Sequence, residues 1–240
     1  MTVASIAGDL APTGTLRAAI NLGNVVLTNG SHEDPAGVTV DIAREAARRL
    51  GVPLHLHLVD AARLSVEALL TGVADIAFVA VEPARAAQIS FTAPYVLIEG
   101  VYVVPEDSDL REPTDVDRAG VRVGVKLGSA YDLYLTRTLE HAQLVRGDEG
   151  VDVYVAHGLE AGAGVRQPAT AWVAAHPGHR VIEARFQEIQ QAAATTSDRS
   201  PAAVAWLRSL VDELLGSGFI ADSLARAGQT DATVAQPRLE

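Results

Sequence analysis

A single arginine, Arg85, lies in the stretch AVEPARAAQISFTAPY (residues 80–95), directly after an apolar run at residues 74–81 that reads as a buried strand. A guanidinium is planar, stays charged when it is buried, and matches a carboxylate with two parallel N–H donors. Arg85 therefore has the chemistry of an anion-binding residue. The alternative is an ordinary surface arginine on a short helix that begins at Pro83, since most arginines are exposed.

A second group suited to anions follows a strand at residues 121–125. The sequence VKLGSAYD runs from that strand through Gly128 into a helix that we expect to begin after Ser129. Backbone N–H groups at a helix N-terminus lack partners within the helix, and together with the helix dipole they favour a negative group. Ser129 has a second interpretation, in which it caps the helix and Asp132 completes a capping box. The two roles are compatible.

Metal and nucleophile chemistry find less support in the sequence. The chain has no cysteine, which excludes disulfides and cysteine-ligated metals. His55 and His57 alternate on one strand, a spacing that can chelate, but they lack an evident third ligand, so we expect them to face solvent. Nucleophile-elbow, phosphate-loop and zinc signatures are missing. We therefore predict no catalytic residue, no metal and no cofactor.

Composition limits the class of protein and its partners. The 240 residues are 48% hydrophobic and 20% charged, which is typical of a soluble globular protein. A formal net charge of −11 disfavours nucleic acid as a partner. No apolar stretch approaches the roughly 20 residues that cross a bilayer. Residues 1–23 lack the pattern of a secretion signal, so either a signal has been removed or the protein stays inside the cell.

Short β-rich runs alternate with helical patterns along the chain, which predicts an α/β fold with largely parallel sheets. A polar segment at residues 107–120 separates two such series, and residues 180–195 supply extended structure leading back. We therefore expect two α/β lobes joined by extended crossover strands, with a ligand cleft between the lobes. The predicted division is 1–103 for the first part of lobe 1, 104–190 for lobe 2, and 191–240 for the return to lobe 1.

Three segments in order resemble family 3 of the solute-binding proteins of ABC importers, the polar amino-acid type. Residues 37–52 match the family's Gly-x-x-x-Asp-Leu-x-x-x-Ile-x-x-x-Leu-Gly helix. Residues 71–95 match a Gly-x-x-Asp strand followed by Thr-x-x-Arg and Phe-Ser-x-Pro-Tyr, and residues 121–135 match Val-Gly-Val-x-x-Gly-Thr-Thr. The resemblance runs from about Gly14 to Gly228. It implies a two-lobed, type II periplasmic-binding-protein fold with two crossover strands, and a bidentate pair between Arg85 and the ligand's carboxylate.

The implied ligand site differs from the family pattern at several positions. Glu82 stands where the family usually has the threonine of Thr-x-x-Arg, and Ala130 replaces the second threonine of the later turn. Phe78 and Ala80 occupy positions that often bear hydroxyl groups, so the polar lining is thinner than in a typical amino-acid receptor. The residues assigned to the site beyond Arg85 and Ser129 are Asn24, Phe78, Ala80, Glu82, Tyr95, Gly128, Ala130 and Arg166.

The strand LEAGAGV, which is followed by Arg166, departs furthest from the family. It aligns with a strand whose final Asp holds the ligand's α-ammonium group, and here that position falls on Val165. If residues 152–158 are that strand instead, His157 takes the position. Neither residue replaces a carboxylate, and an ammonium beside Arg166 would be repelled. The sequence therefore favours an amine-free acid whose far end Arg166 binds, with a surface arginine as the alternative.

These patterns predict a receptor that closes two lobes around a small carboxylate and delivers it to the permease of an ABC importer. The resemblance implies a periplasmic or extracellular monomer. A second hypothesis is a cyclohexadienyl dehydratase-like enzyme, in which Glu82, Glu99 or Glu188 would protonate a leaving hydroxyl group. A third is a ligand sensor in the cytoplasm, which the missing signal would suit.

Overall fold

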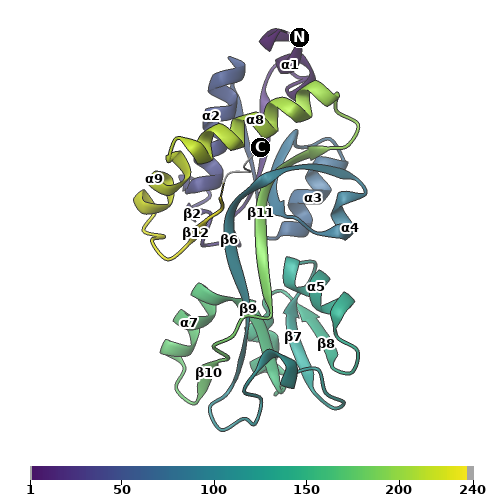
Figure 1. Cartoon of the computed structure of the whole chain (residues 1–240), viewed down its shortest axis with the longest axis vertical. Coiled ribbons are helices and arrows are strands. Elements are labelled where there is room, and N and C mark those ends of the chain that lie inside the picture. The colour runs from purple at the N-terminus through teal and green to yellow at the C-terminus, as the bar shows by residue number, and fades with distance from the viewer. Residues whose placement is uncertain (1, 237–240) are drawn as a thin grey trace. The chain divides into compact units, whose positions relative to one another are not determined.

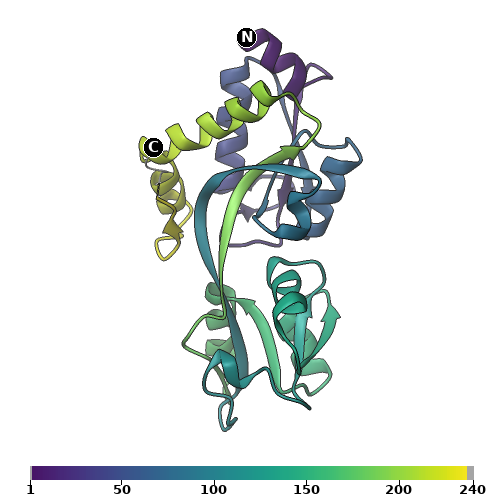
Figure 2. The same cartoon turned by 45° about the vertical axis from the view of Figure 1, so that its right-hand side comes forward.

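The computed structural model describes residues 2–236 and divides the chain into two compact units. Unit 1 joins the residues up to Leu97 to those from Gln190 onward, and unit 2 comprises Ile98–Ile189. Two strands, β6 (Ile89–Pro105) and β11 (Gln187–Thr196), each run from one unit into the other and are neighbours in the sheet (Figure 1; Figure 2). The two predicted crossover strands are therefore confirmed. The lobe boundary predicted after residue 103 falls within β6, and the one predicted after residue 190 falls within β11.

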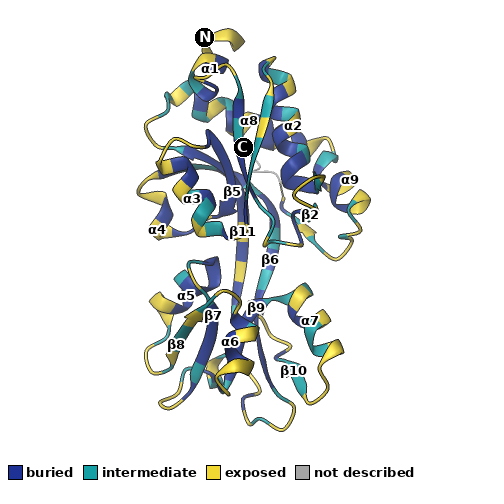
Figure 3. Ribbon diagram, turned by 180° about the vertical axis from the view of Figure 1, so that it is seen from behind, coloured by how far each residue is buried: buried dark blue, intermediate teal, exposed yellow. Residues whose placement is uncertain are grey.

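Unit 1 is a sheet packed against helices. Its elements are α1 (Val3–Leu10), β1 (Leu16–Asn21), β2 (Asn29–Gly30), β3 (Pro35–Ala36), α2 (Val38–Leu50), β4 (Leu54–Val59), α3 (Ala62–Leu70), β5 (Ile76–Ala80), α4 (Pro83–Ala86), α8 (Pro201–Gly216), α9 (Phe219–Arg226) and β12 (Thr233–Val234). The strand order is β4-β1-β5-β11-β6, with β1 parallel to β4 and β5 and with β11 antiparallel to β5. Ala77 and Val79 of β5 pack against α3, and Figure 3 shows the central strands buried.

Unit 2 repeats the parallel strand–helix–strand pattern. Its elements are a 3-10 turn (Pro113–Asp115), β7 (Arg122–Lys126), α5 (Ala130–Thr138), β8 (Gln143–Gly147), α6 (Gly150–Ala156), β9 (Ala161–Val165), α7 (Arg166–Ala175) and β10 (His179–Val181). The strand order is β6-β9-β7-β8, with β7 parallel to β8 and β9 and with β6 antiparallel to β9. The apolar face of α6 packs with Val101 and Val103 of β6.

Each unit contains the same arginine–acid clamp at the start of its parallel strands. In unit 1, Arg17 bonds Asp75 through its backbone N–H (3.0 Å), Nε (2.9 Å) and Nη2 (2.7 Å). In unit 2, Arg122 bonds Glu160 through its backbone N–H (2.8 Å), Nε (3.0 Å) and Nη2 (2.8 Å). Each clamp ties a strand to the residue that precedes the neighbouring parallel strand, so it fixes where both strands begin.

The clamps also relate positions in the two units. Ala80 is the last residue of β5 and Val165 the last residue of β9. The two residues lie at the same distance along the chain from the paired acids, Asp75 and Glu160. Val165 therefore has the same place in unit 2 that Ala80 has in unit 1, at the end of the strand that begins beside the clamp. This agrees with the alignment proposed from the sequence. The alternative in which residues 152–158 form that strand is wrong, because they belong to α6 and the turn after it, and His157 is the C-cap.

The helix over residues 38–50 is confirmed, and its ends have clear causes. Gly51 adopts the left-handed conformation (φ 70°) that closes the helix, which suits glycine because it has no Cβ. Ile42, Ala46 and Leu50 lie on the buried face. In contrast, α1 was not predicted from the sequence. It begins after Thr2, whose side chain accepts a hydrogen bond from the Ser5 N–H (3.3 Å).

Helix α6 packs very close to the backbone of β7 and β9, and glycines on these elements permit the close approach. A Cβ on Gly150 would lie 2.2 Å from the Ala163 carbonyl oxygen, and one on Gly124 would lie 2.4 Å from the Gly150 carbonyl oxygen. Both clashes are with backbone atoms, which side-chain rotation does not relieve. The close packing of α6 therefore depends on the absence of these side chains.

We expect Gly150→Ala to lower the free energy of unfolding by about 1–3 kcal/mol, because the added methyl group forces α6 away from β9. A matched control is Gly216→Ala at the exposed end of α8, where a Cβ would meet nothing within 4 Å. That change should be neutral or stabilising by up to about 1 kcal/mol, since alanine favours helix. Urea denaturation followed by circular dichroism compares the two variants. Equal stabilities would show that α6 can shift without cost.

Candidate functional site

Arg85 lies in the turn that follows β5 and is buried. Pro83 begins the one-turn helix α4, and Arg85 is 5% exposed. Its Nη1 donates a hydrogen bond to the carbonyl oxygen of Ala80 (3.0 Å), which holds the guanidinium at the end of the strand. Burial lowers the pKa of Arg85 to about 10, and the Glu82 carboxylate acts in the opposite direction. Arg85 therefore remains charged at neutral pH and is not a surface arginine.

Glu82 shares this turn with Arg85. It is the residue before α4, is only 2% exposed, and its side chain does not cap the helix. Its backbone carbonyl accepts the Arg85 N–H (2.9 Å). The carboxylate of Glu82 lies near enough to the guanidinium to raise the pKa of Arg85 by charge attraction. A buried acid and a buried base thus lie together after β5.

Phe78 and Tyr95 belong to the core of unit 1. Their rings meet edge to face with centroids 6.2 Å apart, and Tyr95 is fully buried. Burial raises the pKa of the Tyr95 hydroxyl well above its usual value. No described residue forms a hydrogen bond with that hydroxyl group. Phe78 belongs to β5 and Tyr95 to β6, so the two rings join the strands that precede and follow the turn of Arg85.

Asn24 lies in the turn after β1. Its backbone N–H bonds the carbonyl of Asn21 (3.2 Å), and its carbonyl accepts N–H groups from Leu27 and Thr28. Because β1 and β5 are parallel, Asn24, Glu82 and Arg85 all follow strand ends at the same edge of the unit 1 sheet. In open α/β sheets, ligands bind beyond the carboxyl ends of the strands.

In unit 2, Ser129 caps α5. Its hydroxyl accepts the Asp132 N–H (3.0 Å), and Ala130 is the first residue of the helix. The predicted capping box is wrong in one detail, because the Asp132 carboxylate accepts the N–H of Gly128 (2.8 Å) and not that of Ser129. Gly128 has a positive φ of 69°, which brings its N–H within reach of that carboxylate. The helix N-terminus of unit 2 therefore already holds one negative group.

The sequence did not indicate which cation compensates the negative charge of Asp132. The carboxylate is 3% exposed and accepts a hydrogen bond from Nε of Arg146 (2.9 Å), a residue of β8. The residue pattern of β8 does not indicate that Arg146 pairs with Asp132. Arg146 reaches α5 only because β8 pairs with β7 in parallel. Lys126, at the end of β7, forms an ion pair with Glu149. The cations near Ser129 therefore have acidic partners within unit 2.

Arg166 is the first residue of α7 and contacts Glu99 of β6. Its Nε forms an ion pair with the Glu99 carboxylate, and its Nη2 donates to the carbonyl of Glu183 (2.7 Å). Arg185 bonds the other oxygen of Glu99 (2.8 Å), and also lies 3.2 Å from Glu188. The two guanidinium groups lower the pKa of Glu99. Glu99 therefore stays ionised, which is unfavourable for a residue that must donate a proton.

Val165 ends β9 and pairs with Gly100 of β6. The strand end that the sequence pattern aligns with the family's acid therefore carries a branched apolar side chain. Because β7 and β9 are parallel, Ser129 and Val165 follow strand ends at the same edge of the unit 2 sheet. The structure thus brings the predicted residues of unit 2 to one edge, as it does for Asn24, Glu82 and Arg85 in unit 1.

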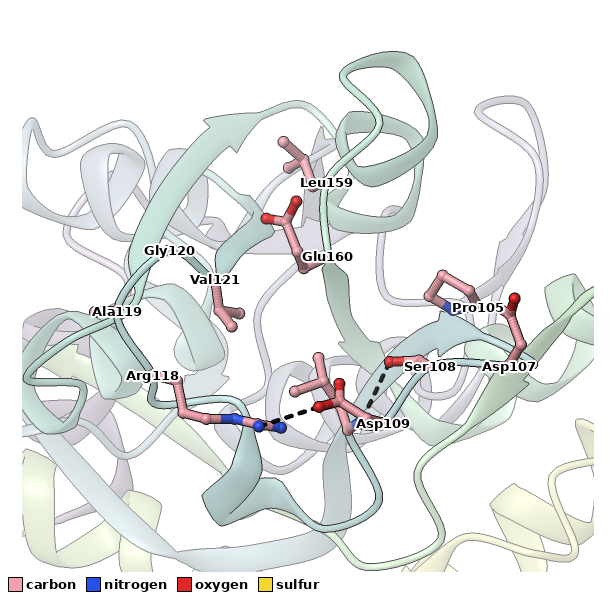
Figure 4. Close-up of a pocket in the computed structure, with 11 residues that line it drawn as sticks. Pro105, Asp107, Ser108, Asp109, Arg118, Ala119, Gly120, Val121, Leu159 and Glu160 are labelled. Atoms are coloured by element: carbon pink, nitrogen blue, oxygen red, sulfur yellow. Dashed lines mark hydrogen bonds and ion pairs between the residues drawn. The ribbon is translucent and has the colours of Figure 1, made fainter.

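A pocket of about 540 Å³ lies at the opposite end of the unit 2 strands (Figure 4). Leu110, Val121 and Leu159 provide apolar walls, and Arg118 bonds Asp109 (3.2 Å) beside it. Val121 precedes β7 and Leu159 precedes β9, so the pocket lies at the amino ends of the strands. It is therefore separate from the edge that carries Ser129 and Val165.

Two further features concern metal ions and the packing of α2. Within residues 2–236, no group of three or more His, Cys, Asp or Glu side chains could hold a metal ion. Asp41 of α2 accepts hydrogen bonds from Ser223 (2.6 Å) and Arg226 (3.0 Å) of α9, so it joins two helices.

Among residues 2–236, every helix is too short or too polar to span a membrane.

Residues 25–229 match the family model described as bacterial extracellular solute-binding proteins, family 3. The chain belongs to this family. The resemblance seen in the sequence is confirmed, and with it the prediction of a solute-binding protein. No curated protein sequence matches the chain.

Solved structures support the same fold. A mutant of ArgBP from T. maritima is 23% identical, with a TM-score of 0.75, covering 93% of this chain and 99% of that protein. AbpA from Streptococcus pneumoniae, an amino acid ABC transporter substrate-binding protein bound to L-arginine, is 19% identical with a TM-score of 0.75, covering 92% and 97%. The ancestral amino acid-binding protein AncCDT-1, a precursor of cyclohexadienyl dehydratase, is 19% identical with a TM-score of 0.71, covering 93% and 98%. These similarities confirm the predicted two-lobed α/β fold class.

Proposed function

We propose that this family 3 solute-binding protein captures a small carboxylate and presents it to the permease of an ABC importer. The observation that carries the proposal is the buried, charged Arg85 at the carboxyl edge of the unit 1 strands. Its planar fork of N–H donors fits a carboxylate better than other anions of similar size. The role fits a receptor placed outside the cytoplasm and acting as a monomer.

We further propose that the ligand lacks an α-ammonium group bound by unit 2. Val165 supplies no charge at the strand end, and Arg166 follows it directly. Glu99, the acid beside Arg166, is shared with Arg185, so an ammonium group there would compete with two guanidinium groups for it, which disfavours ordinary amino acids. The related proteins AbpA and ArgBP bind arginine, so this chain would differ from them in ligand class.

The proposed mechanism is closure of the two units on the ligand. The candidate residues of unit 1 and unit 2 belong to separate folded parts that β6 and β11 join, so two strands can act as the hinge. Ligand contacts made by both units would offset the cost of closing. Arg166 would release Glu99 if it turned to the ligand's far end, and Ser129 would add a hydroxyl group and helix N–H groups.

The experiment is a thermal-shift panel on ligand-stripped protein. It compares amino acids with amine-free mono- and dicarboxylates, including prephenate. A ligand at about 100 times its dissociation constant adds roughly 2.7 kcal/mol of stability, on the order of 5–10 °C for this chain. We expect shifts from amine-free acids and a smaller radius of gyration by X-ray scattering with the same ligand. Shifts from amino acids alone would contradict the amine-free ligand, and no shift from any acid would contradict the carboxylate site.

A further inference from the structure

The turn after β5 contains a buried carboxylate as well as a buried guanidinium. Glu82 and Arg85 are 2% and 5% exposed; Glu82 is the extended residue before α4, and Arg85 lies within that one-turn helix. The Glu82 carboxylate lies near enough to the guanidinium to raise the pKa of Arg85 by charge attraction. The guanidinium is fixed to the end of β5 by the Ala80 carbonyl (3.0 Å), so the acid lies beside a cation whose place is set.

A carboxylate in this position affects which anions Arg85 accepts. An incoming carboxylate gains from the guanidinium but is repelled by Glu82, and repulsion between like charges is strong where water is excluded. The repulsion falls if the ligand places a hydrogen-bond donor between the two carboxylates. A donor on the carbon next to the ligand's carboxylate has the shortest path to Glu82, because that carbon lies nearest to Arg85.

We infer that Glu82 accepts a hydrogen bond from a donor on the carbon adjacent to the ligand's carboxylate, so that the ligand of Arg85 is a 2-hydroxy acid. The inference rests on the proposed carboxylate function and narrows its ligand class. Unit 2 favours a hydroxyl group as the donor, since Val165 supplies no acid for an ammonium group. Glu82 thereby selects ligands that carry this hydrogen-bond donor. The threonine that the family pattern has at this position carries no negative charge, so it would not repel a carboxylate that lacks the donor.

A purely structural role for Glu82 makes a different prediction. If the carboxylate only balances the charge of buried Arg85, its removal should weaken all carboxylate ligands by the same factor. If it accepts the ligand's donor, its removal should affect only ligands that carry the donor. Matched ligands that differ by one group therefore separate the two roles, whatever the variant does to the stability of the fold.

The test uses three sets of matched acids and isothermal titration calorimetry on the full chain. The sets are propionate, lactate and alanine; succinate, malate and aspartate; and 3-phenylpropionate, 3-phenyllactate and phenylalanine. The variants are Glu82→Gln and a control, Glu67→Gln, which makes the same charge change at an exposed site on α3. Circular dichroism confirms that each variant is folded at the titration temperature.

We expect the hydroxy acid of at least one set to bind about tenfold or more tightly than its unsubstituted partner, as a hydrogen bond to a charged group would give. Glu82→Gln should remove most of that advantage and leave the unsubstituted acid within about threefold of its wild-type affinity, while Glu67→Gln changes neither. Equal binding of hydroxy and unsubstituted acids, or an equal loss of both in Glu82→Gln, would overturn the inference.

The remaining outcomes separate this inference from the proposed function. If only the amino acids bind and Glu82→Gln abolishes that binding, Glu82 does accept a donor, but the donor is an ammonium group and the amine-free ligand is wrong. If unsubstituted acids bind best, the carboxylate function stands and the role of Glu82 is wrong. If no acid binds to the folded wild-type protein, the carboxylate site and the inference fall together.

Discussion

Arg85→Ala is expected to weaken carboxylate binding by at least about 30-fold, because truncating one partner of a buried charge pair typically costs about 2–5 kcal/mol. The guanidinium is the buried cation at the carboxyl edge of unit 1, and the Ala80 carbonyl fixes its direction. A methyl group in its place leaves the ligand's carboxylate next to Glu82 with no compensating charge. Isothermal titration calorimetry with an acid found in the thermal-shift panel measures the loss.

Two further variants show whether the charge or the geometry of Arg85 matters. Arg85→Lys keeps a positive charge but lacks the planar fork, so we expect a loss intermediate between wild type and alanine. Arg63→Ala removes an exposed arginine from α3 of the same unit and should leave affinity unchanged. Arg85→Ala also leaves Glu82 buried without its neighbouring cation, so the variant should be titrated well below its unfolding temperature.

Unchanged affinity in Arg85→Ala, with the variant folded, would remove Arg85 from the ligand site. The burial of the side chain would then have a structural reason, namely its bond to the Ala80 carbonyl and its charge interaction with Glu82. A loss confined to Arg85→Ala, with full affinity in Arg85→Lys, would show that the ligand needs a cation but not a bidentate fork.

Local patterns in the sequence were sufficient to predict most elements of this fold. The apolar period of α2 and its closing Gly51 are both local, and so is the Pro83 that begins α4. The location of Arg85 after a fully apolar strand also indicated a buried site. In each of these cases the neighbours along the chain determine the structure, which is the information that a single sequence contains.

Contacts between distant segments could not be predicted in the same way. Arg166 bonds Glu99 because antiparallel pairing places Val165 opposite Gly100, and nothing near either residue in sequence indicates that register. The residues around Arg166 therefore do not distinguish a ligand contact from a pair with Glu99. The bond from Asp132 to the Gly128 N–H differs from a capping box by one residue, a shift that depends on the positive φ of Gly128.

The two units share an arginine–acid clamp at the start of their parallel strands, and the clamp of unit 1 gives the largest expected effect on stability. Asp75 is fully buried and bonds both Arg17 and Arg199, whose Nη2 lies 2.9 Å from Asp75 Oδ1. Asp75→Asn should lower the free energy of unfolding of unit 1 by about 3–5 kcal/mol, because it removes a fully buried acid and leaves two half-buried guanidinium groups without it. This corresponds to roughly 6–20 °C in melting temperature for a chain of this size.

Glu160→Gln is the matched control, because it breaks the equivalent clamp where solvent reaches it. The side chains of Glu160 and Arg122 are 37% and 40% exposed, against 0% and 22% for Asp75 and Arg17. An exposed pair contributes at most about 1 kcal/mol, so Glu160→Gln should shift unfolding only slightly. Hydrogen exchange by segment should show Asp75→Asn loosening β1 and β5 but not β7 and β9. Equal effects of the two variants would mean that the hydrogen bonds that set the strand starts, and not the burial of the acid, give each clamp its stabilising effect.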